Sequence, residues 1–456
     1  MMSKQEKDTS LKLGKRLKSL FPLPFFFAFA FDLVYGFFYY RSYDAVSFYD
    51  TSSYFVAASK LLDGKVDLLR TPLYPLFLHF CEKAGKDNVN RFCVNIQIVI
   101  FCISIYFFYK LLELFTSNKP MLMLGTVFYG CMSAIINYNT FMLTESLAVS
   151  GTVLFCYLLV LYTRNRNNIL LAACIVFALL LAMLRPSFVF LLVVVAVAVA
   201  ILIVRLLKKE KSKLWYVPVI AFVLSMAFLF GYMQKNKKDN GYFGLSYVSD
   251  MNRFYDVVQA DIWHDSLDRA IVDEIQKHLD ENAGVLGAAI KTEETFREKE
   301  NGPDRIIKFN NEVISTHKTD YVNYLVKKVI LMGNTKMQYN LTNDSYFLKE
   351  DADRNMFWPG DLLDFNVNFS YMICLVSVFA VFAVIIKRKK LLEGELLLIL
   401  VMAGQIGINI LSGPAEFHRL NVICYPLALI LLFAGAGIAL DHVLSKKTEE
   451  KTQEKK

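Results

Sequence analysis

The sequence predicts an all-α polytopic membrane protein with about ten transmembrane helices, a helical first outer loop beside the membrane and a small, mostly helical outer domain. Of its 456 residues, 55% are hydrophobic and 14% are aromatic, whereas about half of the residues of a soluble domain are apolar. Apolar runs long enough, or nearly long enough, to cross a bilayer core of about 30 Å recur along the chain. Clusters of Lys and Arg lie in connections that these runs place on one side of the membrane.

The apolar runs give the number of transmembrane segments. The first run is too long for the apolar core of a signal peptide and no small-residue cleavage site follows it, so we expect it to be retained. We place the ten segments at 19–40, 92–115, 120–136, 141–163, 169–184, 186–207, 214–233, 367–387, 394–411 and 418–440.

Lysine and arginine residues gather in the connections on one side of the predicted helices, and this sets the topology. By the positive-inside rule that side is the cytoplasm, so both termini are cytoplasmic and the connections 41–91 and 234–366 face outward. The net charge of +8 therefore follows from topology, and no nucleic-acid partner is expected. The pattern suits a multi-pass protein of a bacterial plasma (inner) membrane. The basic clusters are 2–19, 163–168, 205–213, 387–390 and 445–456.

Four parts of the chain follow from this topology. Residues 1–233 form an N-terminal transmembrane module that includes the first outer connection, 41–91. Residues 234–366 form an extracytoplasmic domain, residues 367–445 the C-terminal transmembrane helices, and residues 446–456 a charged cytoplasmic tail.

The outer domain and the cysteines exclude some kinds of site. Residues 270–279 and 321–332 have helical patterns. Of the eight cysteines, seven lie in or beside predicted transmembrane segments and none lies in 234–366. Neither a disulfide scaffold nor a zinc site is expected.

The first outer connection contains the stretch DTSSYFVAASKLLDG, which begins at Asp50. Its apolar residues Tyr54, Ala57, Ala58 and Leu61 recur at helical spacing and predict a helix on the membrane surface. Asp50 then lies at the N-terminus of that helix. Two interpretations follow: Asp50 is a helix N-cap, or it is a catalytic carboxylate whose direction the cap fixes.

Two short outer connections each carry an arginine, although such connections are usually poor in positive charge. Arg185 lies in LRPS, and Arg419 follows His418 in HRLNVICYP. Each arginine is either an interfacial side chain that reaches lipid head groups or part of a phosphate clamp, since the planar guanidinium fork matches phosphate oxygens. Two arginines and a histidine on one outer rim favour an anionic ligand.

Three carboxylates lie inside or near the ends of predicted transmembrane segments, where a charge costs a few kcal/mol without a polar cavity or a partner. Glu145 lies on the same outer side as Asp50 and is the better site candidate. Two roles for Asp32 are equally open: a structural partner of a basic residue, or a site residue. Glu416 is expected in a loop. Carboxylates beside arginines suit a reaction in which a lipid phosphate leaves without a proton and one base activates an acceptor hydroxyl.

In these features the chain resembles the membrane-embedded GT-C glycosyltransferases, most closely the branch of the protein O-mannosyltransferases and the lipid A aminoarabinose transferase. DTSSYFVAASKLLDG is similar to the start of their first outer loop, which has an Asp, a Tyr four residues later and a Leu-rich turn ending in Gly. RTPLYPLFL follows it, and TESL, LRPS and HRLNVICYP look like later landmarks in the family's order. The resemblance covers the transmembrane segments and is vague over 234–366. Many members have Glu directly after the loop Asp, where this chain has Thr51.

The resemblance implies an inverting transfer of a sugar from a polyprenyl-phosphate donor, whose tail lies among the helices with membrane lipid, to a hydroxyl of a glycan, lipid or protein acceptor. It implies that Asp50 is the general base, with Glu145 as a second catalytic carboxylate. No cofactor is certain and no metal ligand can be assigned, so a role for a divalent cation stays open. The residues expected at the donor phosphate are Arg70, Arg185, His418 and Arg419, and those expected to position the acceptor are Tyr54 and Tyr74.

Two other functions stay open on the sequence alone. A transporter or flippase for a lipid-linked or anionic glycan would also gather arginines and carboxylates. It needs access from both faces, however, and every candidate except Asp32 lies at the outer rim. A membrane scaffold whose segment 234–366 binds a partner would not need the charged residues at the segment ends.

Overall fold

The structure is a computed structural model that describes residues 22–42, 45, 47, 49–210, 212–299, 301–334, 376, 393–413 and 417–453. Helices form all the regular secondary structure in these ranges, as predicted. Glu416 and, apart from residue 376, the predicted segment 367–387 lie outside the described residues, and so does the side chain of His418.

Seven helices in the described ranges are long and apolar enough to cross a membrane, as expected of a multi-pass helical membrane protein. The seven spans contain α2 (Leu23–Ser42), α4 with α5 (Leu73–Gly85 and Val89–Glu113), α8 (Glu145–Asn165), α10 (Val189–Leu207), α11 (Tyr216–Asn240), α19 (Glu393–Ser412) and α21 (Tyr425–Gln453). A shorter apolar helix, α9 (Asn168–Leu184), packs against α8, α10 and α11.

The predicted segment 120–136 does not form one membrane-spanning helix. At 13 residues, α6 (Lys119–Cys131) is only about 20 Å long. It ends because Met132 takes an extended conformation (φ −66°, ψ 113°). Two short turns, α7 (Ser133–Ile136) and η2 (Asn137–Asn139), then lead to α8. The described helices therefore do not provide ten complete spans.

The helix expected in the first outer connection is present as α3 (Tyr49–Leu62). Tyr54, Ala57 and Ala58 are buried, as the helical spacing of the apolar positions requires. The helix ends before Gly64, whose left-handed backbone (φ 72°) favours glycine. Because α4 packs against both α3 and α5, α3 is held beside the apolar helices.

A second hydrophobic core lies in α12–α16, apart from the core of the apolar helices. It encloses Trp263, Phe254 and Phe309, which are almost fully buried. The predicted helical stretches 270–279 and 321–332 lie within α13 and α16. The five helices are α12 (Val248–Gln259), α13 (Arg269–Asp280), α14 (Val285–Arg297), α15 (Gly302–Thr316) and α16 (Lys318–Asn334).

Residues 63–72, which join α3 to α4, connect the two cores. The Tyr247 backbone N–H donates to the Leu68 carbonyl at 2.9 Å. Ser246 Oγ donates to the Leu69 carbonyl at 2.6 Å. The start of α12 thus holds this segment in place.

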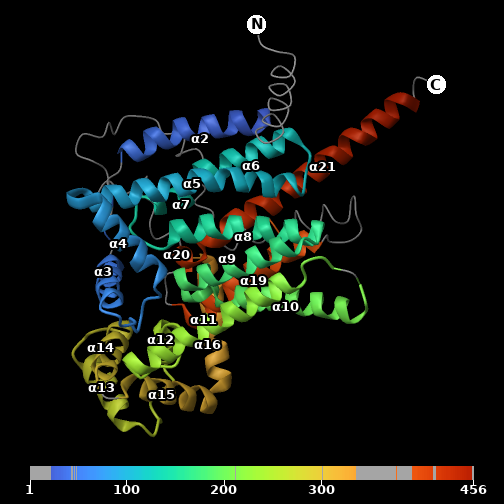
Figure 1. The fold of residues 1–456 in the computed structure, drawn as a ribbon. Helices are drawn as coiled ribbons and strands as arrows, with labels where there is room; N and C mark the ends of the chain where they lie inside the picture. The colour runs from blue at the N-terminus through green and yellow to red at the C-terminus, as the bar shows by residue number, and fades with distance from the viewer. Residues whose placement is uncertain are drawn as a thin grey trace.

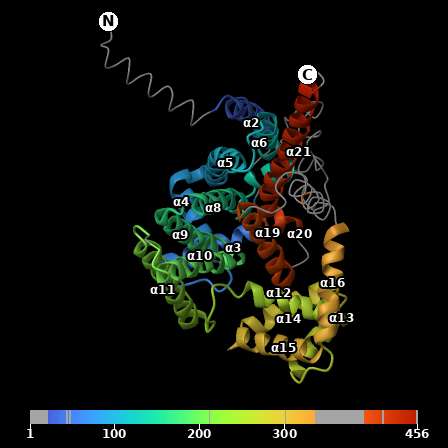
Figure 2. The ribbon, with the colours of Figure 1, turned by 90° about the vertical axis from the view of Figure 1, so that its right-hand side faces the viewer.

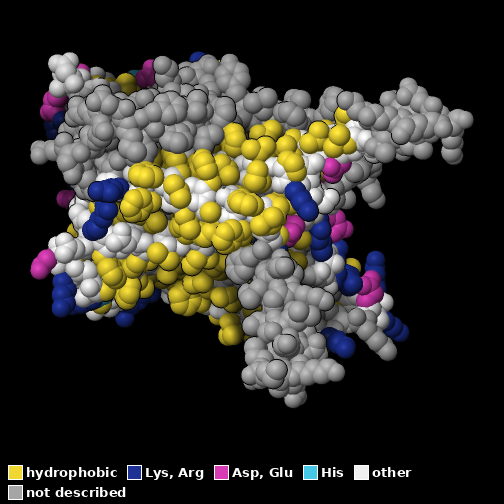
Figure 3. Space-filling view, turned by 90° about the horizontal axis from the view of Figure 1, so that it is seen from above, with side chains coloured by type: hydrophobic (Ala, Val, Ile, Leu, Met, Phe, Trp, Pro, Cys, Tyr) yellow, Lys and Arg dark blue, Asp and Glu magenta, His cyan; other side chains and the backbone are white. Residues whose placement is uncertain are grey.

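The arrangement of the helices leaves one broad apolar surface. Figure 1 shows α2, α5 and α8 running side by side, with α12–α15 gathered at one end of this layer. In Figure 2, α16 extends from the α12–α15 group toward the region of α19, and it contacts both α15 and α19. Hydrophobic side chains cover the middle of the face in Figure 3, and charged side chains lie near its margins. Such a band is typical of a surface that contacts lipid.

Candidate active site

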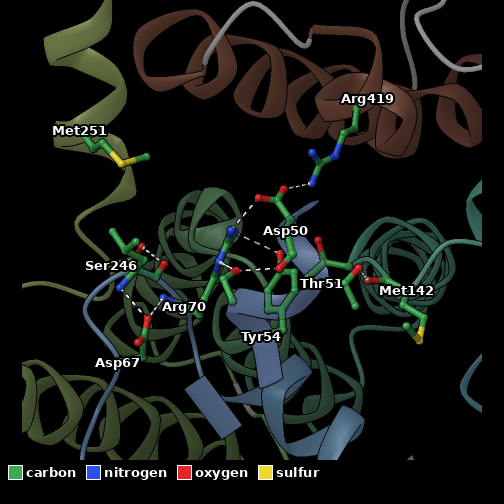
Figure 4. Close-up of polar contacts among 12 residues, drawn as sticks. Asp50, Thr51, Tyr54, Asp67, Arg70, Met142, Ser246, Met251 and Arg419 are labelled. Carbon is green, nitrogen blue, oxygen red and sulfur yellow. Dashed lines mark hydrogen bonds and ion pairs between the residues drawn. The ribbon is translucent and has the colours of Figure 1, made fainter. Parts of the chain in front are cut away.

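Asp50 lies in the first turn of α3, where two arginines hold its carboxylate (Figure 4). Asp50 Oδ1 is 2.8 Å from Arg70 Nη2, and Asp50 Oδ2 is 2.6 Å from Arg419 Nη2. Both oxygens accept hydrogen bonds from guanidinium groups, whereas an N-cap side chain accepts from backbone N–H groups of its own helix. In the structure the Asp50 carboxylate is therefore part of an ion-paired cluster and is not the N-cap of α3, which begins at Tyr49.

Arg70 is fixed through both its backbone and its side chain. Asp67 Oδ1 accepts hydrogen bonds from the backbone N–H groups of Leu69 (2.9 Å) and Arg70 (2.8 Å), which closes a tight turn. Arg70 Nε donates to Ser53 Oγ at 2.8 Å, and its Cζ lies 4.5 Å from the centroid of the Tyr54 ring. Figure 4 shows Arg70 above Tyr54 and directed at Asp50. α3 thus supplies both the carboxylate and the surface on which Arg70 rests.

Arg419 joins Asp50 to a second carboxylate, that of Glu145. Glu145 is the first residue of α8 and is fully buried. Its Oε1 accepts a hydrogen bond of 2.6 Å from Arg419 Nε, and a buried carboxylate is stable only with such a partner. Arg419 lies in α20 (Phe417–Asn421) and is 5% exposed, so one buried guanidinium bridges the two acids.

Arg185 lies at the junction of α9 and η3 (Pro186–Phe188), in an extended conformation. Its side chain is 10% exposed, and its Nη1 is 3.4 Å from Glu145 Oε1. This Nη1 makes no hydrogen bond within the described part of the chain. A buried guanidinium with hydrogen-bonding capacity to spare is suited to an anionic ligand.

Asp50, Arg70, Arg185 and Arg419 line a cavity of about 700 Å³ between the apolar helices and the α12–α16 region, whereas Glu145 is not part of its wall. Three arginines, Arg70, Arg185 and Arg419, face two carboxylates, Asp50 and Glu145, so the cluster has one excess positive charge. The opposite wall comes from α12 and α14. It includes the side chains of Asn252, Tyr255, Glu294 and Arg297.

The surrounding charges set the protonation state of Asp50. Burial raises the pKa of its carboxyl group, but the charges and hydrogen bonds of Arg70 and Arg419 outweigh burial, and the pKa lies below its usual value. Burial lowers the pKa of the Arg70 guanidinium, which Tyr54 and Asp50 more than reverse. Asp50 is therefore a carboxylate at neutral pH.

The two candidate tyrosines occupy different positions. Tyr54 lines the cavity, whereas Tyr74 is fully buried and is not part of the cavity wall. The Tyr74 hydroxyl donates to Gln97 Oε1 at 3.1 Å, and its ring meets the Tyr54 ring edge to face, with 4.9 Å between centroids. Tyr74 thus supports Tyr54 from behind.

Thr51, which stands where the resembling family often has Glu, anchors α3 instead of facing the cavity. Its Oγ1 donates to the Met142 carbonyl at 3.1 Å, and the residue is 3% exposed. The second carboxylate of the cluster comes from Glu145, 95 positions after Asp50.

Sequence reasoning missed the residues that hold the cluster and those of the opposite wall. Asp67 lies three residues before Arg70 in DLLR, and an Asp that accepts from nearby backbone N–H groups is a recognisable turn signal. Glu294 and Arg297 lie in a segment rich in charged residues, where nothing in the local sequence distinguishes them.

No three His, Cys, Asp or Glu side chains in the described ranges lie together as a metal site requires. Both carboxylates of the cluster are ion-paired with arginines. The divalent cation that the sequence leaves open therefore has no assigned ligands in this part of the chain.

Part of the chain is similar to a described protein family. Residues 71–288 match a family described as "Domain of unknown function (DUF6311)". The match covers a little under half of the chain and includes Glu145 and Arg185, whereas Asp50, Arg70 and Arg419 lie outside it. No curated protein matches the chain.

Proposed function

We propose that this protein is an integral membrane glycosyltransferase of GT-C-like organisation that moves a sugar from a polyprenyl-phosphate donor to an acceptor hydroxyl. The observation that carries the proposal is the Asp50 carboxylate, held between Arg70 and Arg419 on the wall of a cavity beside the apolar helices. A carboxylate can take a proton from the acceptor, and arginines can stabilise the charge of a departing phosphate.

The proposed reaction is a single displacement at the anomeric carbon. The acceptor oxygen bonds to this carbon while the bond from the carbon to the phosphate oxygen breaks. The acceptor proton passes to Asp50, and the phosphate leaves with the bonding electron pair. Because the phosphate already carries negative charge, it needs cations and no acid. Attack opposite the leaving group inverts the configuration.

Donor phosphate and Asp50 would compete for the same guanidinium groups. A phosphate that binds Arg70 and Arg419 weakens their ion pairs with Asp50, and this raises the proton affinity of the carboxylate. Glu145 contacts Arg419 through a different nitrogen, Nε, and can hold the guanidinium in place meanwhile. Arg185 adds a further donor of hydrogen bonds. We therefore assign Glu145 to positioning and Asp50 to proton transfer.

The proposal includes a topology. About ten transmembrane helices in a bacterial plasma membrane, with both termini in the cytoplasm, would place the cavity on the outer side. The connection between α10 and α11 and the C-terminal end of α21 lie at one end of the helix layer, and α12–α15 lie at the other (Figure 1). Basic residues are frequent in the first two of these segments, which supports this orientation.

The test is transfer by the purified full chain. Radiolabelled polyprenyl-phosphate sugars are offered to crude membrane acceptors, with wild type and Asp50→Asn side by side. The matched control is Asp63→Asn, because Asp63 is an exposed acid at the end of α3. We expect label to move with wild type and Asp63→Asn, and a loss of at least a hundredfold with Asp50→Asn.

Two outcomes would contradict the proposal. Transfer by Asp50→Asn at the wild-type rate would exclude Asp50 as the base. If no donor supports transfer and labelled lipid instead crosses the leaflets of liposomes that contain the protein, the protein is a flippase.

A further inference from the structure

A second cavity, of about 430 Å³, lies among α2, α5 and α6 and shares no lining residue with the Asp50 cavity. Its walls are mostly apolar and include Phe37, Ile98 and Phe101. Three charged side chains also line it: Asp32, Arg41 and Arg91. Apolar walls with a few charged side chains suit an amphiphilic ligand, which has an apolar part and a polar part.

Asp32 is the buried member of these three charged residues. It lies in the middle of α2 and is 4% exposed. Cys131 Sγ donates to its Oδ1 at 3.2 Å, and Oδ2 makes no hydrogen bond with any described residue. The carboxyl group packs against Gly130 so closely that a Cβ at this position would collide with it. Gly130 thus makes room for the Asp32 carboxyl group, of which only Oδ1 has a hydrogen-bond partner among the described residues.

An unpaired acid in a low-dielectric site is expected to be neutral, since burying the charge costs far more than protonation. A neutral carboxyl group has an O–H that needs an acceptor. The ligand therefore carries a polar, uncharged acceptor at the depth of Asp32.

The two arginines mark the other end of the cavity. Arg41 lies in the last turn of α2 and Arg91 in the first turn of α5, and both are exposed. Nine residues of helix separate Arg41 from Asp32, or about 14 Å along the axis. Helical side chains lean toward the N-terminus, so the long Arg41 side chain shortens this separation. Two cations above an apolar cavity suit a lipid phosphate near the membrane surface.

From these contacts we infer that the α2–α5–α6 cavity binds an anionic phospholipid, with its phosphate at Arg41 and Arg91 and an ester carbonyl as the acceptor for Asp32. Its acyl chain lies along Phe37, Ile98 and Phe101. A polyprenyl phosphate would offer the same phosphate but no carbonyl. Asp32 therefore distinguishes the two sources of phosphate.

The test uses delipidated full-length protein and two readouts, native mass spectrometry and thermal unfolding. The added lipids are phosphatidylglycerol, phosphatidylcholine and a polyprenyl phosphate. We expect phosphatidylglycerol to bind most tightly and to raise the unfolding temperature. In Arg41→Gln/Arg91→Gln its affinity should fall roughly tenfold or more, because the variant lacks both cations proposed to bind the phosphate.

Two further variants test the carbonyl contact. Asp32→Asn keeps an N–H donor and should retain binding, whereas Asp32→Leu should weaken it. The control is Lys83→Gln, because Lys83 is an exposed cation near the end of α4 and does not line the cavity. It should bind as wild type does.

Three results would overturn the inference. The first is unchanged phosphatidylglycerol binding in Arg41→Gln/Arg91→Gln, which alters only exposed side chains and should fold. The second is equal binding of phosphatidylcholine. The third is tight binding of polyprenyl phosphate when phosphatidylglycerol does not bind, which would make the cavity a site for the donor class of lipid.

Discussion

At the scale of single residues, Arg419 is notable because its one buried guanidinium pairs with two carboxylates. Its guanidinium serves Asp50 through Nη2 and Glu145 through Nε, both at 2.6 Å. Within the described residues, removal of Arg419 would leave the fully buried Glu145 with the 3.4 Å contact to Arg185 as its remaining ion pair. Arg70 is different, because its partner Asp50 is partly exposed and keeps Arg419. Arg70 is therefore the better position at which to test how charge tunes the proposed base.

We expect Arg70→Gln to shift the acidic limb of the pH profile of kcat/KM to higher pH. Arg70 and Arg419 hold the pKa of Asp50 below its usual value, so wild-type Asp50 stays ionised as the pH falls. Loss of one cation within ion-pair distance raises a carboxyl pKa by roughly one unit or more, so the variant loses its base at a higher pH. The measurement is sugar transfer between pH 4 and 8, with Lys65→Gln, an exposed cation of the same connection, as control. An unmoved limb would show that another group titrates.

At the scale of elements, one buried ion pair joins α16 to α12, and its lysine also donates a hydrogen bond at the end of α19. Lys328 Nζ lies 2.7 Å from both carboxylate oxygens of Asp256 and donates to the Gly413 carbonyl at 2.7 Å. Cationic groups are favourable at the C-terminal end of a helix such as α19. Asn409, in the last turn of α19, donates to Asn421 Oδ1 at 2.7 Å. The α12–α16 region thus holds the end of α19 from which the chain continues to α20 and Arg419.

Lys328→Met should destabilise the protein strongly. Burial raises the pKa of Asp256 to about 6, although Lys328 opposes this, and burial lowers the pKa of Lys328. Both shifts show that the pair is costly to bury, and removing one partner leaves the other buried charge unpaired, at about 3–5 kcal/mol. The apparent unfolding temperature at a fixed scan rate should fall for Lys328→Met.

The double variant Lys328→Met/Asp256→Asn should recover part of this loss, because it removes the buried charge. The exposed neighbour Lys327 provides the control Lys327→Met, which should unfold as wild type does. If Lys328→Met unfolds like Lys327→Met, the ion pair does not hold α16 against α12.

The elements also show what the sequence could predict. α3 was predictable because its apolar residues have helical spacing and a glycine follows it. The end of α6 at Cys131 was not, because the sequence stays apolar through 120–136 and the break at Met132 depends on tertiary packing. Glu145, Arg185 and Arg419 could be singled out because charges near the ends of membrane segments are costly without a partner, and Asp50 because it begins the helical pattern of the first outer connection. Which arginine meets which acid depends on contacts between residues up to 369 positions apart, and local patterns carry no such information.

At the scale of the whole molecule, the cavity lies where two hydrophobic cores meet. One core belongs to the apolar helices and the other to α12–α16. α3, α9 and α20 bring Asp50, Arg185 and Arg419 to one side, and α12 and α14 close the other. The proposed chemistry then requires the α12–α16 region to lie outside the cytoplasm, where the predicted topology places it.

Cysteine labelling in intact cells tests this orientation. The seven cysteines in the described ranges are free, six of them buried and Cys102 half-buried, so little labelling is expected from them. Cys374 lies outside these ranges and is changed to Ala in every variant. Leu267→Cys places a thiol at a residue that is 85% exposed, in the connection before α13. Lys208→Cys places one at the exposed end of α10.

We expect a membrane-impermeant maleimide to label Leu267→Cys in intact cells and Lys208→Cys only after permeabilisation. The physical reason is the run RLLKKEKSK, whose lysines and arginine favour a cytoplasmic location for the connection after α10. The variant without an added cysteine gives the background. If Lys208→Cys is labelled in intact cells and Leu267→Cys is not, the cavity opens toward the cytoplasm. A sugar donor displayed on the outer leaflet could then not reach Asp50, and transfer at the outer face would be excluded even if purified protein were active.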